Sequence, residues 1–418
     1  MPLLESAKQK VESLLETISQ VRELDFPFEH SRDALNQLES TFLELKGTLD
    51  TLGPKNSPEI TRNFCRVTLA KIFQLLPLIG FVASSSEISG PVEFHGPFLR
   101  LVKRAIGPRA KLVISSDWQY SPYTYIFPNY LEDLGLVMVG IPVSESDNAL
   151  VTPIAGHELG HNIWAIKRLD GTINPLLYSH IITLMQGKYW ERVKEEHKLK
   201  EKERLENDMF GIEVWQNALL WARAQAEETF CDLVGLYTFR ESYLHAFEYL
   251  LSPWGMNRQP TYPSMRDRIA TLCAAATAAN VAIPADFIES FESIEQDDST
   301  LLLEIADEAA RSIRNDLFNL AIQVCESKSL SPKAIETGSA INAIDLGIPA
   351  SGIGEFQTIL NAGWEICGRI DSTWEEKSEL KGNRHRKLVF LNELLLKSLE
   401  TFEIEQLQKG DECSAEQQ

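Results

Sequence analysis

The stretch His157-Glu158-Leu159-Gly160-His161 constrains this chain most, because it sets two histidines four residues apart around a glutamate. Residues four apart lie on one face of an α-helix, about one turn from each other. Two imidazoles at this spacing can reach one metal ion, and the glutamate points to the side, where it can act on a water molecule held by that ion. The competing interpretation is a pair of histidines that pack in the core of the molecule.

The residues around this pattern predict a strand followed by a helix. Residues 134–142 are a short apolar run closed by a proline, which is typical of a strand. Thr152 stands before a proline, a pattern that predicts an N-cap and a helix over residues 153–168. Inside a helix, Gly156 and Gly160 each cost about 1 kcal/mol relative to alanine. Glycines at these positions make sense if another backbone or a substrate approaches closely.

A catalytic zinc site needs three protein ligands and an open fourth position. The best candidate for the third ligand is Glu228, which shares a helix face with Asp232 four residues later. Asp232 can accept a hydrogen bond from one histidine, with His157 preferred, and so fix its tautomer. Glu227 is the fallback ligand. The alternative is a solvated acidic patch, but the apolar residues over 219–237 predict a buried helix, in which a carboxylate needs a partner.

The pattern H-E-x-x-H followed by E-x-x-x-D on a later helix resembles the gluzincin metallopeptidases. Residues 261–269 read T-Y-P-S-M-R-D-R-I and resemble the T-H-P-x-x-x-x-R-I segment of the CAAX prenyl endopeptidase group and its soluble bacterial relatives. In that group the histidine helps to stabilise the oxyanion and the arginine braces the site. The resemblance therefore implies these roles for Tyr262 and Arg268. The chain departs from the family at Tyr262, although a phenol can also donate to an oxyanion. An ordinary helix start at Pro263 is the other interpretation.

The resemblance implies a zincin-like core, α+β in class and mostly α, with a small mixed sheet and two metal-bearing helices flanked by helical regions. His157, His161 and Glu228 would hold Zn²⁺, and Glu158 would move the proton of the attacking water. We therefore expect a soluble zinc-dependent endopeptidase that acts on a restricted protein partner, with a regulatory protein as a further partner. The alternative is a catalytically silent module of the same fold that binds or regulates a partner through its helical flanks.

Composition breaks predict three domains. Residues 1–53 form a helical hairpin, residues 59–283 form the peptidase core, and residues 284–418 form a C-terminal helical domain. A charged insertion interrupts the core at about residues 170–212, and its densest part predicts an exposed helix with ion pairs over residues 188–208. Two further strands are expected in the core, over residues 111–116 and 123–127.

Charge and hydropathy exclude several partners. Lys plus Arg number 40 and Asp plus Glu number 60, so the formal charge of −20 argues against nucleic acid. The N-terminus lacks the features of a signal peptide, and the apolar run at 72–83 is too short and too broken to span a bilayer. We expect a cytoplasmic protein without a membrane partner. Its six scattered cysteines are typical of reduced thiols, and Cys231 is expected to be small core filler.

Overall fold

The computed structural model is mostly helical and contains one small mixed sheet of three strands, which confirms the predicted fold class. Two compact units make up the chain: Met1–His95 with Gly107–Asp147, and Gly96–Ile106 with Asn148–Gln418. Their boundaries differ from residues 53 and 283, and the three-domain division stays a prediction. The structure describes residues 3–52, 56–87, 92–117, 122–125, 135–199, 201–202, 205–206, 209–252, 258–291, 300–332 and 335–415.

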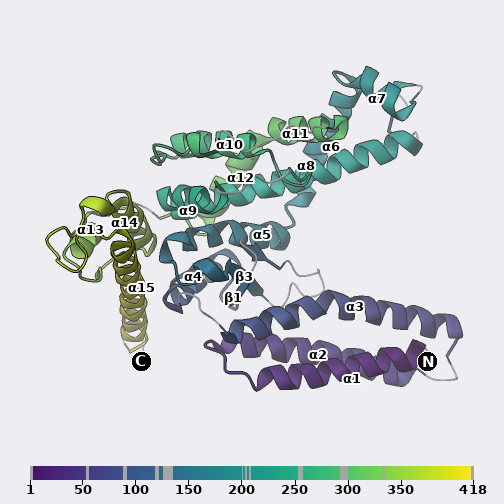
Figure 1. Ribbon diagram of the computed structural model, residues 1–418. Coiled ribbons are helices and arrows are strands. Elements are labelled where there is room, and N and C mark those ends of the chain that lie inside the picture. The colour runs from purple at the N-terminus through teal and green to yellow at the C-terminus, as the bar shows by residue number, and fades with distance from the viewer. Residues whose placement is uncertain are drawn as a thin grey trace. The chain divides into compact units, whose positions relative to one another are not determined.

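Three long helices form the first part of unit 1 and are drawn in purple and blue in Figure 1. Apolar residues at helical spacing, such as Ile18, Leu38 and Phe42, are almost completely buried where these helices pack together. The first two pack against each other, while the separate hairpin domain over residues 1–53 stays a prediction. The three helices are α1 (Leu3–Arg22), α2 (Glu29–Thr51) and α3 (Pro58–Ser84), and α3 leads through η1 (Ser85–Glu87) toward α4 (Val92–Ala105).

The sheet of unit 1 has the strand order β1-β3-β2. The parallel pair sets Lys111 of β1 opposite Leu136 of β3, and the antiparallel pair sets Tyr123 of β2 opposite Gly140 of β3. Gly140 is required there, because a Cβ atom would come within 2.2 Å of the Tyr123 ring. The strands are β1 (Lys111–Asp117), β2 (Tyr123–Thr124) and the buried β3 (Leu136–Pro142), followed by η3 (Val143–Glu145). The expected strand over 123–127 is shorter, with residues 126 and 127 outside the described part.

Helix α3 is longer and more continuous than the apolar run at 72–83 predicts, because Pro77 lies inside it without ending it. By length and composition alone, α3 is apolar enough to cross a membrane, and it is the one such helix among the described residues. Core helices of soluble proteins pass the same test, and 39% of its most apolar window is buried. The expectation that the protein has no membrane partner therefore stays a prediction.

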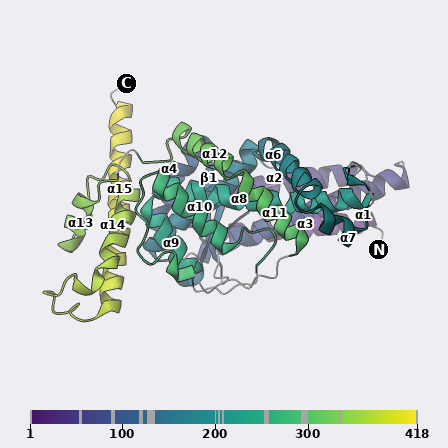
Figure 2. The same cartoon turned by 90° about the horizontal axis from the view of Figure 1, so that it is seen from above.

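Unit 2 is helical and is organised around the long helix α8 (Met209–Phe239). The motif helix α5 (Ala155–Lys167) packs against α8, and Figures 1 and 2 show α10 (Met265–Ala278), α11 (Leu301–Ser312) and α12 (Arg314–Ser327) alongside it. Unit 2 also contains most of α4, from Gly96 onward. Its other elements are η4 (Ala149–Ile154), α6 (Asp170–Gln186), α7 (Trp190–His197), α9 (Glu241–Leu251), η6 (Glu289–Phe291), α13 (Gly338–Asp345), α14 (Gln357–Gly368), η7 (Ile370–Ser372) and α15 (Arg384–Ala415).

The start of the motif helix differs from its prediction. Thr152 is not an N-cap, since its hydroxyl donates to the carbonyl of Ala149 at 2.7 Å inside the 3₁₀ turn η4. The cap belongs to Asn148, whose side chain accepts a hydrogen bond from the backbone of Leu150 at 3.1 Å. Because the 3₁₀ turn extends through Ile154, the α-helix begins only at Ala155.

The charged insertion contains α6 and α7. The exposed helix expected over 188–208 is shorter, because α7 spans only Trp190–His197, and residues 200, 203–204 and 207–208 lie outside the described part. Cations of the insertion pair with the C-terminal region. Arg192 binds Glu304 at 2.6 Å, and Lys188 binds Glu308, where both glutamates belong to α11. These pairs are solvated and each contributes little stability, but they show that the insertion and α11 belong to one unit.

Candidate metal centre

Two glycines let the backbones of α5 and α8 approach closely. A Cβ atom on Gly160 would lie 2.7 Å from the Cα atom of Cys231, and one on Gly156 would lie 3.0 Å from the Cα atom of Gly235. Real Cβ atoms do not come so near, so larger residues would force the helices apart. The expected reason for these glycines, the close approach of another backbone, is confirmed. The contact sets the motif of α5 directly against the acidic residues of α8.

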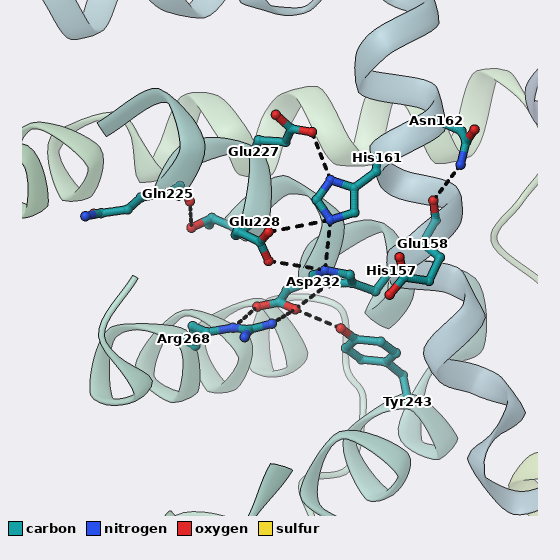
Figure 3. Close-up of polar contacts among 11 residues, drawn as sticks. His157, Glu158, His161, Asn162, Gln225, Glu227, Glu228, Asp232, Tyr243 and Arg268 are labelled. Carbon is teal, nitrogen blue, oxygen red and sulfur yellow. Dashed lines mark hydrogen bonds and ion pairs between the residues drawn. The ribbon is translucent and has the colours of Figure 1, made fainter. Parts of the chain in front are cut away.

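Each motif histidine is held at Nδ1 by a carboxylate of α8 (Figure 3). His157 Nδ1 lies 2.9 Å from Asp232 Oδ1, and His161 Nδ1 lies 2.8 Å from Glu227 Oε1. Since a carboxylate accepts, both Nδ1 atoms donate, which leaves both Nε2 atoms to face inward. The Nε2 atoms lie 3.2 Å apart. Two imidazole lone pairs at this separation repel each other unless a cation, a proton or a metal ion, lies between them.

Glu228 completes the group. Its Oε2 atom lies 3.3 Å from Nε2 of His157, and its Oε1 atom lies 3.6 Å from Nε2 of His161. Oε2 is buried and has no hydrogen-bond partner among the described residues. Donors about 2.05 Å from a tetrahedral zinc ion are separated by about 3.3 Å. The three separations of 3.2, 3.3 and 3.6 Å therefore fit a zinc ion held by His157, His161 and Glu228.

The charges of the site are strongly coupled. Burial works against a charged His157, but its hydrogen bond to Asp232 and its ion pair with Glu228 outweigh it and raise its pKa to about 10. Burial likewise works against an ionised Glu228, while the ion pair with His157 lowers the pKa of that carboxyl overall. Burial raises the pKa of Glu158, opposed by the two histidines. Glu158 thus has the environment of a general base whose affinity for a proton is increased.

Asp232 is the centre of a buried network. Besides His157, its carboxylate accepts two hydrogen bonds from Arg268, at 2.7 and 2.8 Å, and one from the hydroxyl of Tyr243 at 2.9 Å. Burial opposes the ionised form, but Arg268 and His157 hold the pKa of Asp232 well below its usual range. Gly235 makes room for this arrangement, because a Cβ atom there would overlap the Tyr243 ring at 2.3 Å. Arg268 thus reaches the site through Asp232, and its own catalytic role stays a prediction.

Tyr262 lies on the loop that precedes α10 and is 43% exposed. Its pKa is raised to about 12, first by the charge of Glu228 and then by burial. The charges of both Glu228 and Glu158 contribute to this increase in the pKa. It is therefore protonated at neutral pH and able to donate a hydrogen bond.

A second buried network holds the loop of residues 258–264, called the Tyr262 loop below. The Nε2 atom of Gln225, one helical turn before Glu228, donates to the carbonyl of Pro260 and to Asp307 Oδ1, both at 2.9 Å. Asp307 of α11 also binds Arg258 at the start of the loop. The loop is thus tied to the ligand helix and to the C-terminal region at the same point.

Cys231 lies on α8 against α5 and is completely buried. Burial, followed by Glu228 and Glu227, raises its pKa well above the usual value. Ligand atoms of His157, His161 and Cys231 lie within 4.8 Å of one another. The thiol therefore packs as a small buried group, as expected, but it does so beside potential ligands.

Sequence reasoning missed three participants: Tyr243, Gln225 and Asp307. The role of Glu227, which orients His161, was also missed, although its place beside Glu228 is a visible signal. Nothing in the local pattern distinguishes the other three, because their partners are distant in sequence. No protein-family model, curated protein or solved structure matches the chain.

Proposed function

We propose that the chain is a zinc-dependent endopeptidase of gluzincin type, soluble and cytoplasmic, that acts on a restricted protein partner. One observation carries the proposal. Two imidazole Nε2 atoms and a buried carboxylate converge at 3.2–3.6 Å, while both Nδ1 atoms are engaged by other carboxylates. This is a three-ligand set with each histidine fixed by an outer partner, the form that catalytic zinc sites take.

His157, His161 and Glu228 would hold the ion. When bound, zinc supplies a Lewis acid that polarises a carbonyl and activates water for attack. Glu158, buried between the two histidines on α5, takes the proton of the attacking water and later gives it to the leaving amine. The raised pKa of this carboxyl, caused mainly by burial, favours acceptance of the proton.

Two further residues support the transition state in this proposal. Tyr262 keeps its phenolic proton at neutral pH, as a phenol with an ordinary pKa of about 10 already does, so it can donate to the oxyanion of the tetrahedral intermediate. Arg268 holds Asp232 and thereby the ring of His157. The resemblance of residues 261–269 to the prenyl endopeptidase group gave the first indication of both roles.

The first test is metal content, measured by elemental mass spectrometry on the wild type and on Glu228→Gln after both have been supplied with zinc. We expect about one zinc per wild-type chain and loss of zinc in the variant. Glu213→Gln, the same change at an exposed position of α8, is the matched control and keeps the metal. A well-folded wild type without zinc would contradict the proposal and favour a binding module that kept the motif without its chemistry.

A further inference from the structure

Cys231 lies between the two helices of the metal centre. It follows Glu228 by three residues on α8, so both side chains lie on the side of that helix that faces α5. Gly160 provides the space, because a Cβ atom there would come 3.1 Å from the Cys231 sulfur. The thiol is therefore close to the motif helix at the level of the two histidines.

The distances bring this thiol within reach of a shared ion. One ligand atom from each of His157, His161 and Cys231 lies within 4.8 Å of the other two. A nitrogen and a sulfur bound to one tetrahedral zinc ion are about 3.5 Å apart, from bond lengths near 2.05 and 2.3 Å. The sulfur needs to close by little more than about 1 Å, which lies within the reach of a rotation about the one side-chain torsion of cysteine.

The chemistry of the two α8 donors differs. Glu228 offers a carboxylate oxygen that is buried and has no hydrogen-bond partner in the described part of the chain. Oxygen donors suit hard and borderline ions, whereas thiolates select thiophilic ones, and imidazole serves both. The same two histidines could therefore share a metal ion with either a hard oxygen donor, Glu228, or a soft sulfur donor, Cys231.

We propose that Cys231 gives the histidine pair a second donor set, His157–His161–Cys231, which captures thiophilic cations such as Cd²⁺ in competition with the His157–His161–Glu228 set. When the sulfur coordinates, the thiol proton leaves to solvent and the thiolate binds the ion. Because both sets use the same two imidazoles, a thiophilic ion excludes zinc from its catalytic position. The inference rests on the proposed function, since it takes the histidine pair to be a metal site.

The test is a cadmium titration of the full reduced chain, followed by the sulfur-to-cadmium charge-transfer absorbance in the near ultraviolet. We expect the band in the wild type and in Glu228→Gln at the first equivalent of cadmium. In Cys231→Ser we expect the band to disappear and cadmium affinity to fall by at least about 10-fold. Removing a residue that only orients a metal ligand already lowers metal affinity by about 10-fold or more, and removing a ligand should cost at least as much. Cys325→Ser, which alters another buried cysteine, is the control and keeps the band.

Zinc affinity, measured by competition with a chelating dye, separates this inference from the proposed function. It should depend on Glu228 and change little in Cys231→Ser. Zinc binding without a cadmium–sulfur band, or a band that persists in Cys231→Ser, would overturn the second donor set alone. Absence of zinc and cadmium binding would overturn both proposals. If Cys231→Ser fails to fold, cadmium NMR of the wild type reports sulfur ligation directly, and a shift typical of nitrogen and oxygen ligands only would overturn the inference.

Discussion

At the scale of single residues, the site is defined by what holds the far side of each ring. Asp232 and Glu227 engage the Nδ1 atoms of His157 and His161, and both Nε2 atoms therefore face the same point. Rings fixed in this way would lose little conformational freedom when an ion binds. This would raise the affinity for the ion and keep the ligand atoms in a defined geometry. The side chains of the proposed zinc site are thus already in place without an ion.

Glu158→Gln tests the proton-transfer role at this scale. The amide has nearly the same size but cannot accept the proton, so we expect peptide hydrolysis to fall by about 10²–10⁴-fold. Zinc content should stay at the wild-type value, because Glu158 is not a ligand. Parallel assays of turnover and bound zinc check this, and loss of the metal from the variant would count against the assigned role.

The pKa of His157 gives a prediction about pH. With a pKa raised to about 10, the ring is protonated at neutral pH until an ion displaces the proton. Zinc binding then releases one proton from this residue, so the apparent affinity should rise with pH by about tenfold per unit between pH 6 and 8. Calorimetry in buffers of different ionisation enthalpy measures the released proton. An affinity that does not change with pH would contradict the raised pKa.

At the scale of elements, the site depends on the closeness of two helices. Gly156 and Gly160 are costly inside α5 for the helix itself, yet they are the positions where α8 comes nearest. The local cost is offset by a contact that puts two histidines within reach of three acids. A change that alters the packing of α5 on α8 should therefore also alter the geometry of the proposed metal centre.

Gly160→Ala should separate helix propensity from packing. A Cβ atom at this position would lie 2.7 Å from backbone of α8, and we expect a loss of about 1–3 kcal/mol in stability with weaker zinc binding. Gly171→Ala in α6 meets no atom within 4 Å and should leave stability unchanged or raise it by up to about 1 kcal/mol. Urea denaturation of both variants is the measurement, and equal effects would rule out the steric explanation.

Local spacing predicted the parts of the site that lie within single helices. The four-residue spacings in α5 and α8 predicted which side chains share a face, and the contact between Asp232 and His157 is present. The predicted start of α5 at residue 153 was wrong, because Asn148 caps a 3₁₀ turn and the spacing of apolar residues does not reveal such a turn. Contacts across the sequence, such as that of Tyr243 with Asp232, depend on how helices pack and leave no local trace.

At the scale of the molecule, the C-terminal region takes part in the site through α11. Asp307 binds Gln225 of the ligand helix and Arg258 of the Tyr262 loop, and both ionic groups are largely buried. A chain ending near residue 283 would lose this contact. The region predicted as a separate domain therefore supports the position of the loop.

Asp307→Ala should destabilise the chain by about 3 kcal/mol, because it leaves Arg258 buried without its partner. Amide hydrogen exchange of residues 258–264 should increase, since the loop loses its anchor. Glu308→Ala, at the neighbouring position, removes a solvated pair with Lys188 and a hydrogen bond from the Tyr189 hydroxyl. Neither partner belongs to the loop, so exchange of residues 258–264 should change little and stability should fall by less than in Asp307→Ala. Unchanged exchange in Asp307→Ala would mean that the loop is held by other contacts.

The crossing of α5 and α8 has a consequence for chains that have been cut. The two histidines belong to α5, whereas Glu227, Glu228 and Asp232 belong to α8, and α6 and α7 lie between them in the sequence. A nick between His197 and Met209 would leave imidazoles on one fragment and acids on the other. Metal would then act as a cross-link, and the two pieces should reassemble more tightly as its concentration rises.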